Sequence, residues 1–320
     1  PEDGESIGAP LYLDASEVYS PDSGKWEAVG DMTEPRGRHT TLLLSDGRVL
    51  ATGGVSVVES DVERARTLNL ASAEIFDPVT NSWEKIESMT EPRWGHSSTL
   101  LKDGRVLVAG GDSGKRLETA EVYDLTSGEW TQIASMGRVR GDHTGFLLED
   151  GRVLLVGGGG NTTALYDPST GEWSLGANMP RRTGKGGAVM LPGEWVLLVG
   201  GRILDSSLKS SDYRNELIYD ANTNEWFTTE TIPEELVTRN RTGPSVHLLD
   251  NGEVLVAGGN NDYTITLLYE PSDGIWRSAG KLKLARRFQT GTFLSDGRVM
   301  IAGGVDSRGA TTNSVEMYSP

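Results

Sequence analysis

Short stretches in which apolar and polar residues nearly alternate recur along the chain, and six of them end in a pair of glycines. This alternation is the period of a β-strand with two different faces. Residues 96–111, His-Ser-Ser-Thr-Leu-Leu-Lys-Asp-Gly-Arg-Val-Leu-Val-Ala-Gly-Gly, predict a strand, a two-residue turn and a second strand. Asp103-Gly104 favours a type I′ turn, in which both central residues have positive φ. Pro192-Gly193 must turn differently, because proline cannot adopt positive φ.

Two further strands follow each glycine pair at a regular spacing. In the second repeat, Ala120-Glu-Val-Tyr-Asp predicts a third strand, and a turn leads to a fourth strand at Trp130, seven residues after Tyr123. We expect these tryptophans to be buried between neighbouring sheets. Trp94 breaks the pattern and is expected nearer the rim, where it could contact a ligand. The spaced pairs are Tyr19 and Trp26, Phe76 and Trp83, Tyr123 and Trp130, Tyr166 and Trp173, Tyr219 and Trp226, and Tyr269 and Trp276.

The four-strand unit repeats every 43 to 58 residues, roughly, which is the range of β-propeller blades. A small sheet cannot bury both of its faces alone, so neighbouring sheets must stack around a ring. The sequence therefore predicts an all-β protein: one six-bladed propeller over residues 1–320, with four-stranded antiparallel blades. Seven blades is the alternative, because the tyrosine strand occurs seven times.

The two ends of the chain compete for one place in this scheme. The strands of Tyr19 and Tyr318 both fit the third position of the last blade, and its fourth strand would be residues 24–29. Closure by joining the N- and C-terminal strands would remove exposed sheet edges. Residues 1–16 read like a loop that follows a glycine pair, so residues 1–320 could also be part of a longer array.

The repeat has three recurring sequence motifs: Arg-x-x-His, Asp-Gly-Arg-Val-Leu-Val-x-Gly-Gly, and Ala-Glu-x-Tyr-Asp-Pro-x-Thr-x-x-Trp. It resembles the kelch repeat, and bacterial kelch-repeat proteins in particular. The resemblance implies a kelch-like propeller but no single activity, since the family includes scaffolds, oxidases, an epimerase and specifier proteins. A copper radical oxidase of the galactose-oxidase kind is disfavoured, because its Tyr–Cys cross-link needs a cysteine. The iron motif of the specifier proteins, Glu-x3-Asp-x3-His, is absent at every histidine.

Composition narrows the partners. The formal charge of −16 without a basic stripe disfavours nucleic acid and anionic lipid. The chain has no cysteine, which removes disulfides and thiolate chemistry. No apolar run is long enough to insert in a membrane, and residues 1–16 do not read as a signal peptide. We expect no cofactor and no metal, and favour a secreted or cell-surface location over the cytoplasm.

Candidate site residues lie where the chain passes from one blade to the next. Two long loops, Val55–Leu70 and Arg202–Asn215, share a rim with these passages and would flank a groove, unless they are merely tolerated insertions. A repeated arginine there could attract an anionic ligand, or it could pair with Glu17, Glu74, Glu121 and Glu316. The histidines could meet a metal or bond to the backbone. The predicted ligand-binding residues are Arg36, Arg93, Arg140, Arg182, Arg241, Arg286, His39, His96, His143, Trp94, Arg202 and Tyr213.

Three function classes follow. The first is a binding module that uses one rim for a protein or for an acidic or polyhydroxylated ligand. The second is an enzyme (an isomerase, a lyase or a carbohydrate-active enzyme) with arginine, histidine and tyrosine at the funnel mouth. The third is a purely structural surface repeat. If all the arginines are paired internally, we expect a protein segment as the ligand.

Overall fold

The computed structural model describes residues 12–58, 66–158, 160–203, 215–236, 241–259 and 264–320. Within them the regular structure is β, apart from one 3-10 turn at Glu234–Leu236. None of the helical structure in these ranges is long and apolar enough to cross a membrane. The chain forms two compact units: unit 1 holds residues 1–141 and 167–173, and unit 2 holds residues 142–166 and 174–320.

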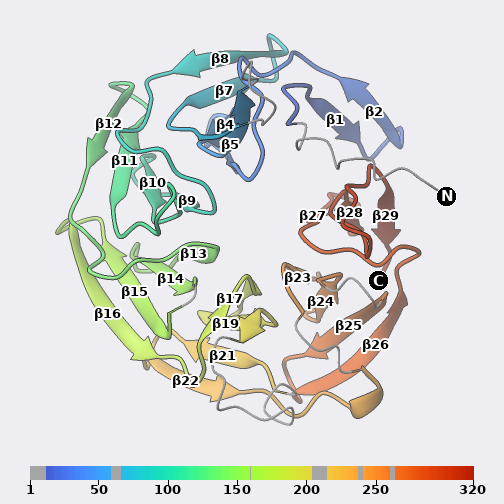
Figure 1. Cartoon of the computed structure of the whole chain (residues 1–320). Helices are drawn as coiled ribbons and strands as arrows, with labels where there is room; N and C mark the ends of the chain where they lie inside the picture. The colour runs from blue at the N-terminus through green and yellow to red at the C-terminus, as the bar shows by residue number, and fades with distance from the viewer. Residues whose placement is uncertain (1–11, 59–65, 159, 204–214, 237–240, 260–263) are drawn as a thin grey trace, which may run out of the picture. The chain divides into compact units, whose positions relative to one another are not determined.

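Unit 1 contains two four-stranded antiparallel sheets whose strands follow one another in chain order, and two two-stranded sheets. Figure 1 shows the strands β9 to β12 side by side in that order. The first sheet is β3 (Thr40–Leu43), β4 (Val49–Thr52), β7 (Ala73–Asp77) and β8 (Ser82–Ile86). The second is β9 (Ser97–Leu100), β10 (Val106–Ala109), β11 (Ala120–Asp124) and β12 (Glu129–Gln132). The two small sheets are β1 (Glu17–Ser20) with β2 (Lys25–Ala28), and β5 (Val55–Val58) with β6 (Arg66–Asn69).

Unit 2 carries the remaining sheets, again in chain order. Three have four strands: β13 (His143–Leu147), β14 (Val153–Gly157), β15 (Thr162–Asp167) and β16 (Glu172–Asn178); β18 (Gly187–Leu191), β19 (Trp195–Val199), β21 (Leu217–Asp220) and β22 (Glu225–Thr228); β23 (Ser245–Leu248), β24 (Val254–Ala257), β25 (Ile265–Glu270) and β26 (Ile275–Lys281). A fourth sheet has three strands: β27 (Thr290–Phe293), β28 (Val299–Ala302) and β29 (Val315–Tyr318). A fifth sheet pairs two short strands, β17 (Thr183–Gly184) and β20 (Arg202–Ile203). The prediction of an all-β chain with six blades is confirmed, each blade beginning with the strand pair that ends in Gly-Gly.

The C-terminal tyrosine strand takes the disputed place in the last blade. Tyr318 of β29 lies opposite Val299, the same register that Tyr123 has with Val106. The strand of Tyr19 pairs instead with that of Trp26. Closure of the ring by the terminal strands stays a prediction, because β2 and β29 belong to different units.

The Asp-Gly turns are hairpins, but of another type than predicted. At Asp103-Gly104 only the glycine has positive φ, at 87°. Leu101 N donates to Arg105 O at 2.8 Å, and Gly104 N donates to Leu101 O at 3.1 Å. The turn is therefore a three-residue loop with one left-handed glycine, and the type I′ prediction was wrong. The turn at Pro192 does differ, as expected: Gly193 and Glu194 both have positive φ.

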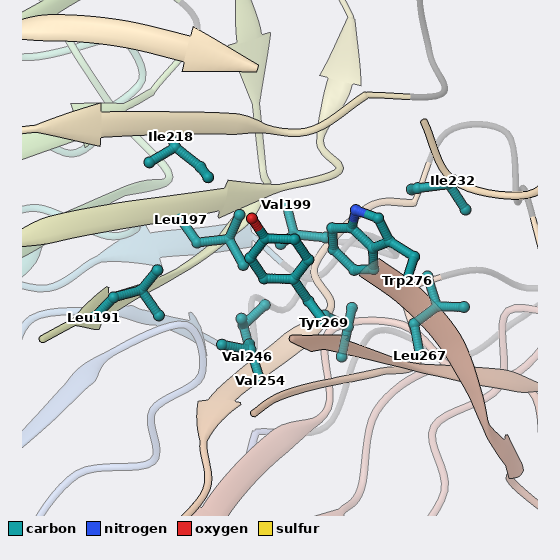
Figure 2. Close-up of a cluster of buried hydrophobic side chains, with 11 residues drawn as sticks. Leu191, Leu197, Val199, Ile218, Ile232, Val246, Val254, Leu267, Tyr269 and Trp276 are labelled. Carbon is teal, nitrogen blue, oxygen red and sulfur yellow. The ribbon is translucent and has the colours of Figure 1, made fainter. Parts of the chain in front are cut away.

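The tryptophans lie between blades, as predicted. The indole N–H of Trp130 donates to Glu87 O at 2.8 Å, and that of Trp226 donates to Ala177 O at 3.2 Å; both acceptors belong to the preceding blade. Figure 2 shows Trp276 beside Tyr269, among side chains of the preceding sheet such as Leu197 and Val199.

The burial of the tryptophans is nearly complete only at Trp276, which is 4% exposed. Trp26 is 41% exposed, and Trp83, Trp130, Trp173 and Trp226 are half-buried. The reason is their place on the fourth strand of each sheet. In five of these pairs the indole ring packs on the aromatic ring of the third strand, with the ring centroids 4.7 to 5.3 Å apart. The fourth strand is the edge strand of its sheet, which leaves part of the indole ring exposed.

Candidate functional site

The repeated arginines are internal cross-links of the blades. Arg93 is fully buried; its Nη1 donates to Gly110 O at 2.8 Å and its Nη2 to Glu121 Oε1 at 2.8 Å. Glu121 Oε2 accepts the backbone N–H of Thr90 as well. The same pairs form in two other blades, Arg36 with Glu74 and Arg286 with Glu316. The alternative of internal pairing is therefore present in these three blades, and a ligand role for the arginines stays a prediction.

Arg140 and Arg241 are equally buried, although the carboxylate position of their blades is apolar. Ala164 lies opposite Leu155, and Leu267 opposite Val256, where Glu121 lies opposite Val108. Desolvation lowers the pKa of both guanidinium groups to about 10. Arg241 Nη1 still donates to Gly258 O at 2.8 Å, so it keeps the bond to the glycine pair. Neither side chain lies at a surface where a ligand could reach it.

The fourth blade shifts the register by one residue. Met190 pairs with Val196 as Leu100 pairs with Val106, which places Thr183, not Arg182, at the position of Arg93. Thr183 Oγ1 donates to Gly200 O at 3.0 Å, replacing the guanidinium bond. Arg182 is exposed. The prediction counted back from Gly193, but this turn carries its glycine one residue earlier than the Asp-Gly turns do.

Arg181 supplies the ion pair of the fourth blade in place of Arg182. Its Nη2 lies 3.1 Å from Glu216 Oε2, and that carboxylate also accepts Gly200 N at 2.9 Å. Both side chains are buried, and burial raises the pKa of Glu216. This arginine was missed because it stands outside the repeated spacing.

The histidines are built into the blades. His96 is buried, and its Nε2 lies 2.9 Å from both Thr40 Oγ1 and Thr52 Oγ1. Desolvation, with the nearby charge of Arg36, lowers the pKa of His39 to about 4. His143 is buried as well. Across the described ranges no three His, Asp or Glu side chains are grouped so that they could hold a metal ion.

Beside the buried arginines and the histidines, each blade passage has one partly or fully exposed residue, which we call the corner residue. It stands just before the histidine position and has positive φ in every blade. Gly243 N donates to Lys185 O at 2.7 Å and Phe288 N to Gly243 O at 3.2 Å, so corner residues of consecutive blades in unit 2 are joined through their backbones. The corner residues are Arg38, Gly95, Asp142, Lys185, Gly243 and Phe288.

Among the corner residues of unit 2, Phe288 is unusual because it is a large apolar residue. Its ring is 45% exposed, and Lys185 Nζ and Arg287 Cζ each lie 5.3 Å from the ring centroid. Lys185 Nζ also lies 3.8 Å from Asp142 Oδ2, and Arg287 Nε has no hydrogen-bond partner. A left-handed backbone costs a bulky residue about 1–2 kcal/mol, and such strain concentrates at functional positions. Lys185, Arg287 and Phe288 form our candidate binding site, the cation–aromatic corner.

Unit 1 has one cation–aromatic contact of the same kind among its described residues. The guanidinium of Arg38 lies 4.9 Å from the ring centroid of Trp94. Trp94 is half-buried and forms a β-bridge with Asp112. Its contact with a ligand stays a prediction. The corner residues themselves were missed because their types vary from blade to blade. Glycine at two of them, Gly95 and Gly243, was the only sequence signal of the positive φ.

The remaining predictions concern the long loops. Val55–Leu70 is not a plain loop, since β5 (Val55–Val58) and β6 (Arg66–Asn69) pair within it. Arg202 lies in β20 (Arg202–Ile203), which pairs with β17 (Thr183–Gly184). Tyr213 lies outside the described residues. The two loops belong to different units, so the groove between them stays a prediction.

Comparisons with known proteins agree with the fold. The Kelch motif matches residues 36–90 and 93–137. A fungal alcohol oxidase among the AA5 family, solved in complex with copper, has a TM-score of 0.76 at 17% identity and covers 96% of this chain and 67% of its own. The fold is thus a six-bladed β-propeller. The resemblance to kelch-repeat proteins is confirmed.

The sequence relatives match only parts of the chain. Galactose oxidase of Gibberella zeae is 38% identical over 77 residues, which are 24% of this chain and 11% of that protein. An F-box/kelch-repeat protein of Arabidopsis thaliana is 29% identical over 123 residues, 35% of this chain and 24% of its own length. Kelch-like protein 28 of Mus musculus is 30% identical over 114 residues, which are 35% of this chain and 19% of that protein.

The residues present do not fit a copper radical site. Such a site needs a Tyr–Cys cross-link, and the sequence contains no cysteine. It holds four histidines, of which His96 is bonded to threonine hydroxyls and His143 is buried at a blade passage. The likeness to the alcohol oxidase is therefore a likeness of fold alone.

Proposed function

We propose that the chain is a binding module that holds a protein segment on the rim carrying the corner residues. The observation that carries the proposal is the cation–aromatic corner. There an exposed phenylalanine with a left-handed backbone lies 5.3 Å from each of two cationic groups, whereas the buried Arg93 is paired internally. The internal pairing of Arg36, Arg93 and Arg286 supports a protein ligand over a free anion, although Arg182 is exposed.

The chemistry of the corner favours a segment with an acidic side chain next to an apolar one. Phe288 offers apolar surface of the kind that anchors interfaces. Lys185 and Arg287 offer local positive charge in a chain of net charge −16, so only a short acidic stretch is attracted there and long acidic surfaces are repelled.

An enzyme is the second candidate, supported by the partial match to galactose oxidase and by the fold of the alcohol oxidase. The acid–base groups that the sequence suggests for it include Arg93, Arg140, His96 and His143. All four are buried, and Arg93 and His96 are bonded to groups within the blades. The binding module therefore takes precedence.

The test is selection from a random peptide library displayed on phage, followed by fluorescence polarisation with the selected peptides. We expect enrichment of Asp or Glu beside Leu or Phe, and binding that weakens with salt. Phe288→Ala and Arg287→Ala should weaken binding by about tenfold or more, as expected for interface anchors. Phe293→Ala is the matched control, since Phe293 is an exposed phenylalanine at the other end of β27.

Two results would overturn the proposal. One is a library that yields no peptide with saturable binding. The other is equal weakening by Phe288→Ala and Phe293→Ala, which would place the peptide away from the corner. Melting temperatures of all variants separate lost binding from lost folding.

A further inference from the structure

Unit 1 contains a cavity of about 500 Å³ that the proposed function does not use. It lies at the turns β3–β4, β9–β10 and β11–β12, which are the ends of the strands away from the corner residues. Its size is in the range of small-ligand sites. The lining residues are Ser45, Asp46, Arg48, Asp103, Gly104, Arg105, Asp124, Leu125 and Thr126.

Two walls of the cavity are identical ion pairs held by their own turns. Arg48 Nε and Nη2 lie 2.9 and 2.8 Å from Asp46 Oδ2, and the backbone N–H of Arg48 donates to Asp46 Oδ1. Arg105 makes the same bonds to Asp103 at 2.8 and 2.7 Å. These hydrogen bonds hold the pKa of each Asp carboxyl below its usual range, so both pairs are ionised. Each guanidinium is thus fixed before any ligand arrives, which reduces the entropy lost on binding.

The third wall adds a carboxylate and a hydroxyl. Asp124 Oδ1 accepts the backbone N–H groups of Thr126 at 2.7 Å and Ser127 at 3.3 Å, which fixes the turn. Thr126 and Ser45 bring hydroxyl groups to the lining. The cavity therefore holds three carboxylates and two guanidinium groups, and its net charge is negative.

We infer that this cavity binds a neutral, polyhydroxylated ligand of the size of a sugar. A guanidinium only donates hydrogen bonds, and a carboxylate only accepts them. A hydroxyl group does both, so a ligand with neighbouring hydroxyls matches a lining in which the two kinds alternate. An anion is opposed by the excess of carboxylates, and a cation competes with two guanidinium groups already paired there.

The arrangement depends on two neighbouring Asp-Gly-Arg turns within unit 1. In unit 2 the same ion pair forms at the β13–β14 turn, between Asp150 and Arg152, and at the β27–β28 turn, but the other two hairpin turns of the unit differ. At the β18–β19 turn Glu194 reaches across and accepts the backbone N–H of Glu149. At the β23–β24 turn Glu253 pairs with Arg277. The β27–β28 turn keeps the pair of Asp296 and Arg298 but lacks a second one beside it, because Asn251 stands where Asp103 does in the β9–β10 turn. Asp296 and Arg298 thus provide a matched control.

The test is titration with glucose, galactose and mannose, followed by the side-chain Nε–H signals of arginine in ¹⁵N NMR spectra. Galacturonate and galactosamine serve as the charged counterparts of galactose. We expect saturable shifts at Arg48 and Arg105 with at least one neutral hexose, and weaker binding of both charged sugars. Arg48→Lys with Arg105→Lys should weaken binding at least about fivefold, because lysine cannot reproduce the two-point pair. Arg298→Lys should leave it unchanged.

The proposal is overturned if no neutral hexose gives saturable shifts up to about 100 mM, the range of very weak affinities. It is also overturned if a charged sugar binds more tightly than galactose, or if Arg298→Lys weakens binding as much as the double variant. Peptide binding at the cation–aromatic corner should be unaffected by the double variant. The two proposals therefore fail independently.

Discussion

The blades β9–β12 and β18–β22 have the same four strands but start differently. The first begins with Arg93, Gly95 and His96, and the second has Thr183, Lys185 and Gly186 at the corresponding positions. The bond to the glycine pair survives in both, through a guanidinium in one and a threonine hydroxyl in the other. The blade therefore needs a hydrogen-bond donor to the carbonyl of the first glycine of the pair. The arginine side chain also forms an ion pair with the carboxylate of the third strand, Glu121.

The largest effect is expected from breaking that ion pair. Arg93→Met leaves the buried carboxylate of Glu121 without its cation, which typically costs about 3–5 kcal/mol of unfolding free energy. Arg182→Met, at an exposed residue of the other blade, should change the free energy by less than about 0.5 kcal/mol. Urea unfolding measures both. Equal losses would mean that Arg182, not Thr183, is the structural counterpart of Arg93.

The histidine position predicts a pH effect in the first blade that β18–β22, with Gly186, cannot have. The pKa of His39 is about 4, below its ordinary value, so the folded state favours the neutral ring. Its contribution to stability is complete above about pH 6.5 and is lost as the pH falls towards 4. At about pH 5 the loss is about 2 kcal/mol. His39→Gln should therefore reduce the fall in melting temperature between about pH 7 and pH 5. An unchanged fall would show that other groups carry it.

A smaller loss is expected at His96. The ring bonds to Thr40 and Thr52, but these hydroxyls also lie 2.9 Å from each other and keep one partner without it. His96→Phe should cost about 1 kcal/mol, the net value of ordinary hydrogen bonds. Chemical denaturation checks this, with Phe at the exposed position of Arg182 as the control substitution. A loss as large as that of Arg93→Met would assign the histidine a role in more than these two bonds.

The smallest effect should be a gain. Lys185 has a φ of 61°, at the position that glycine occupies in β9–β12. Lys185→Gly removes the left-handed strain, offset in part by the entropy of glycine, and should stabilise the fold by up to about 1 kcal/mol. The same substitution removes a cation from Phe288 and should weaken binding of acidic peptides. Unchanged peptide binding would separate Lys185 from the site.

The repeat could be predicted from the sequence because its recurring residues are required by the backbone conformation. Both glycines of every pair have positive φ, and Gly54 N, Gly111 N and Gly259 N each donate to the carbonyl of the next blade's arginine at 2.8 Å. Such needs leave little choice of residue, so the pattern survives in the sequence. The spacing of Tyr and Trp is equally constrained, because the two rings meet across neighbouring strands.

The candidate site was less readable, for two physical reasons. The corner residues need only positive φ and surface exposure, so arginine, lysine and phenylalanine all occur there and no motif results. The cavity of unit 1 arises from three turns of two consecutive blades, and each of these turns reads as an ordinary hairpin turn by itself. The misplacement at Arg182 has a third cause, since a single turn of different type shifts every count made from its glycine.

The glycine pairs also close the loops that follow them. Gly53 N donates to Ser72 O and Leu70 N to Gly54 O, while Gly110 N donates to Thr119 O and Leu117 N to Gly111 O. The same pair of backbone hydrogen bonds therefore closes a long loop at its two ends in one blade and a short loop in the next. Sealed bases make these sites natural acceptors for grafted sequences. A foreign peptide placed between Gly111 and Leu117 would be displayed at a fixed root while the sheet beneath it stays intact.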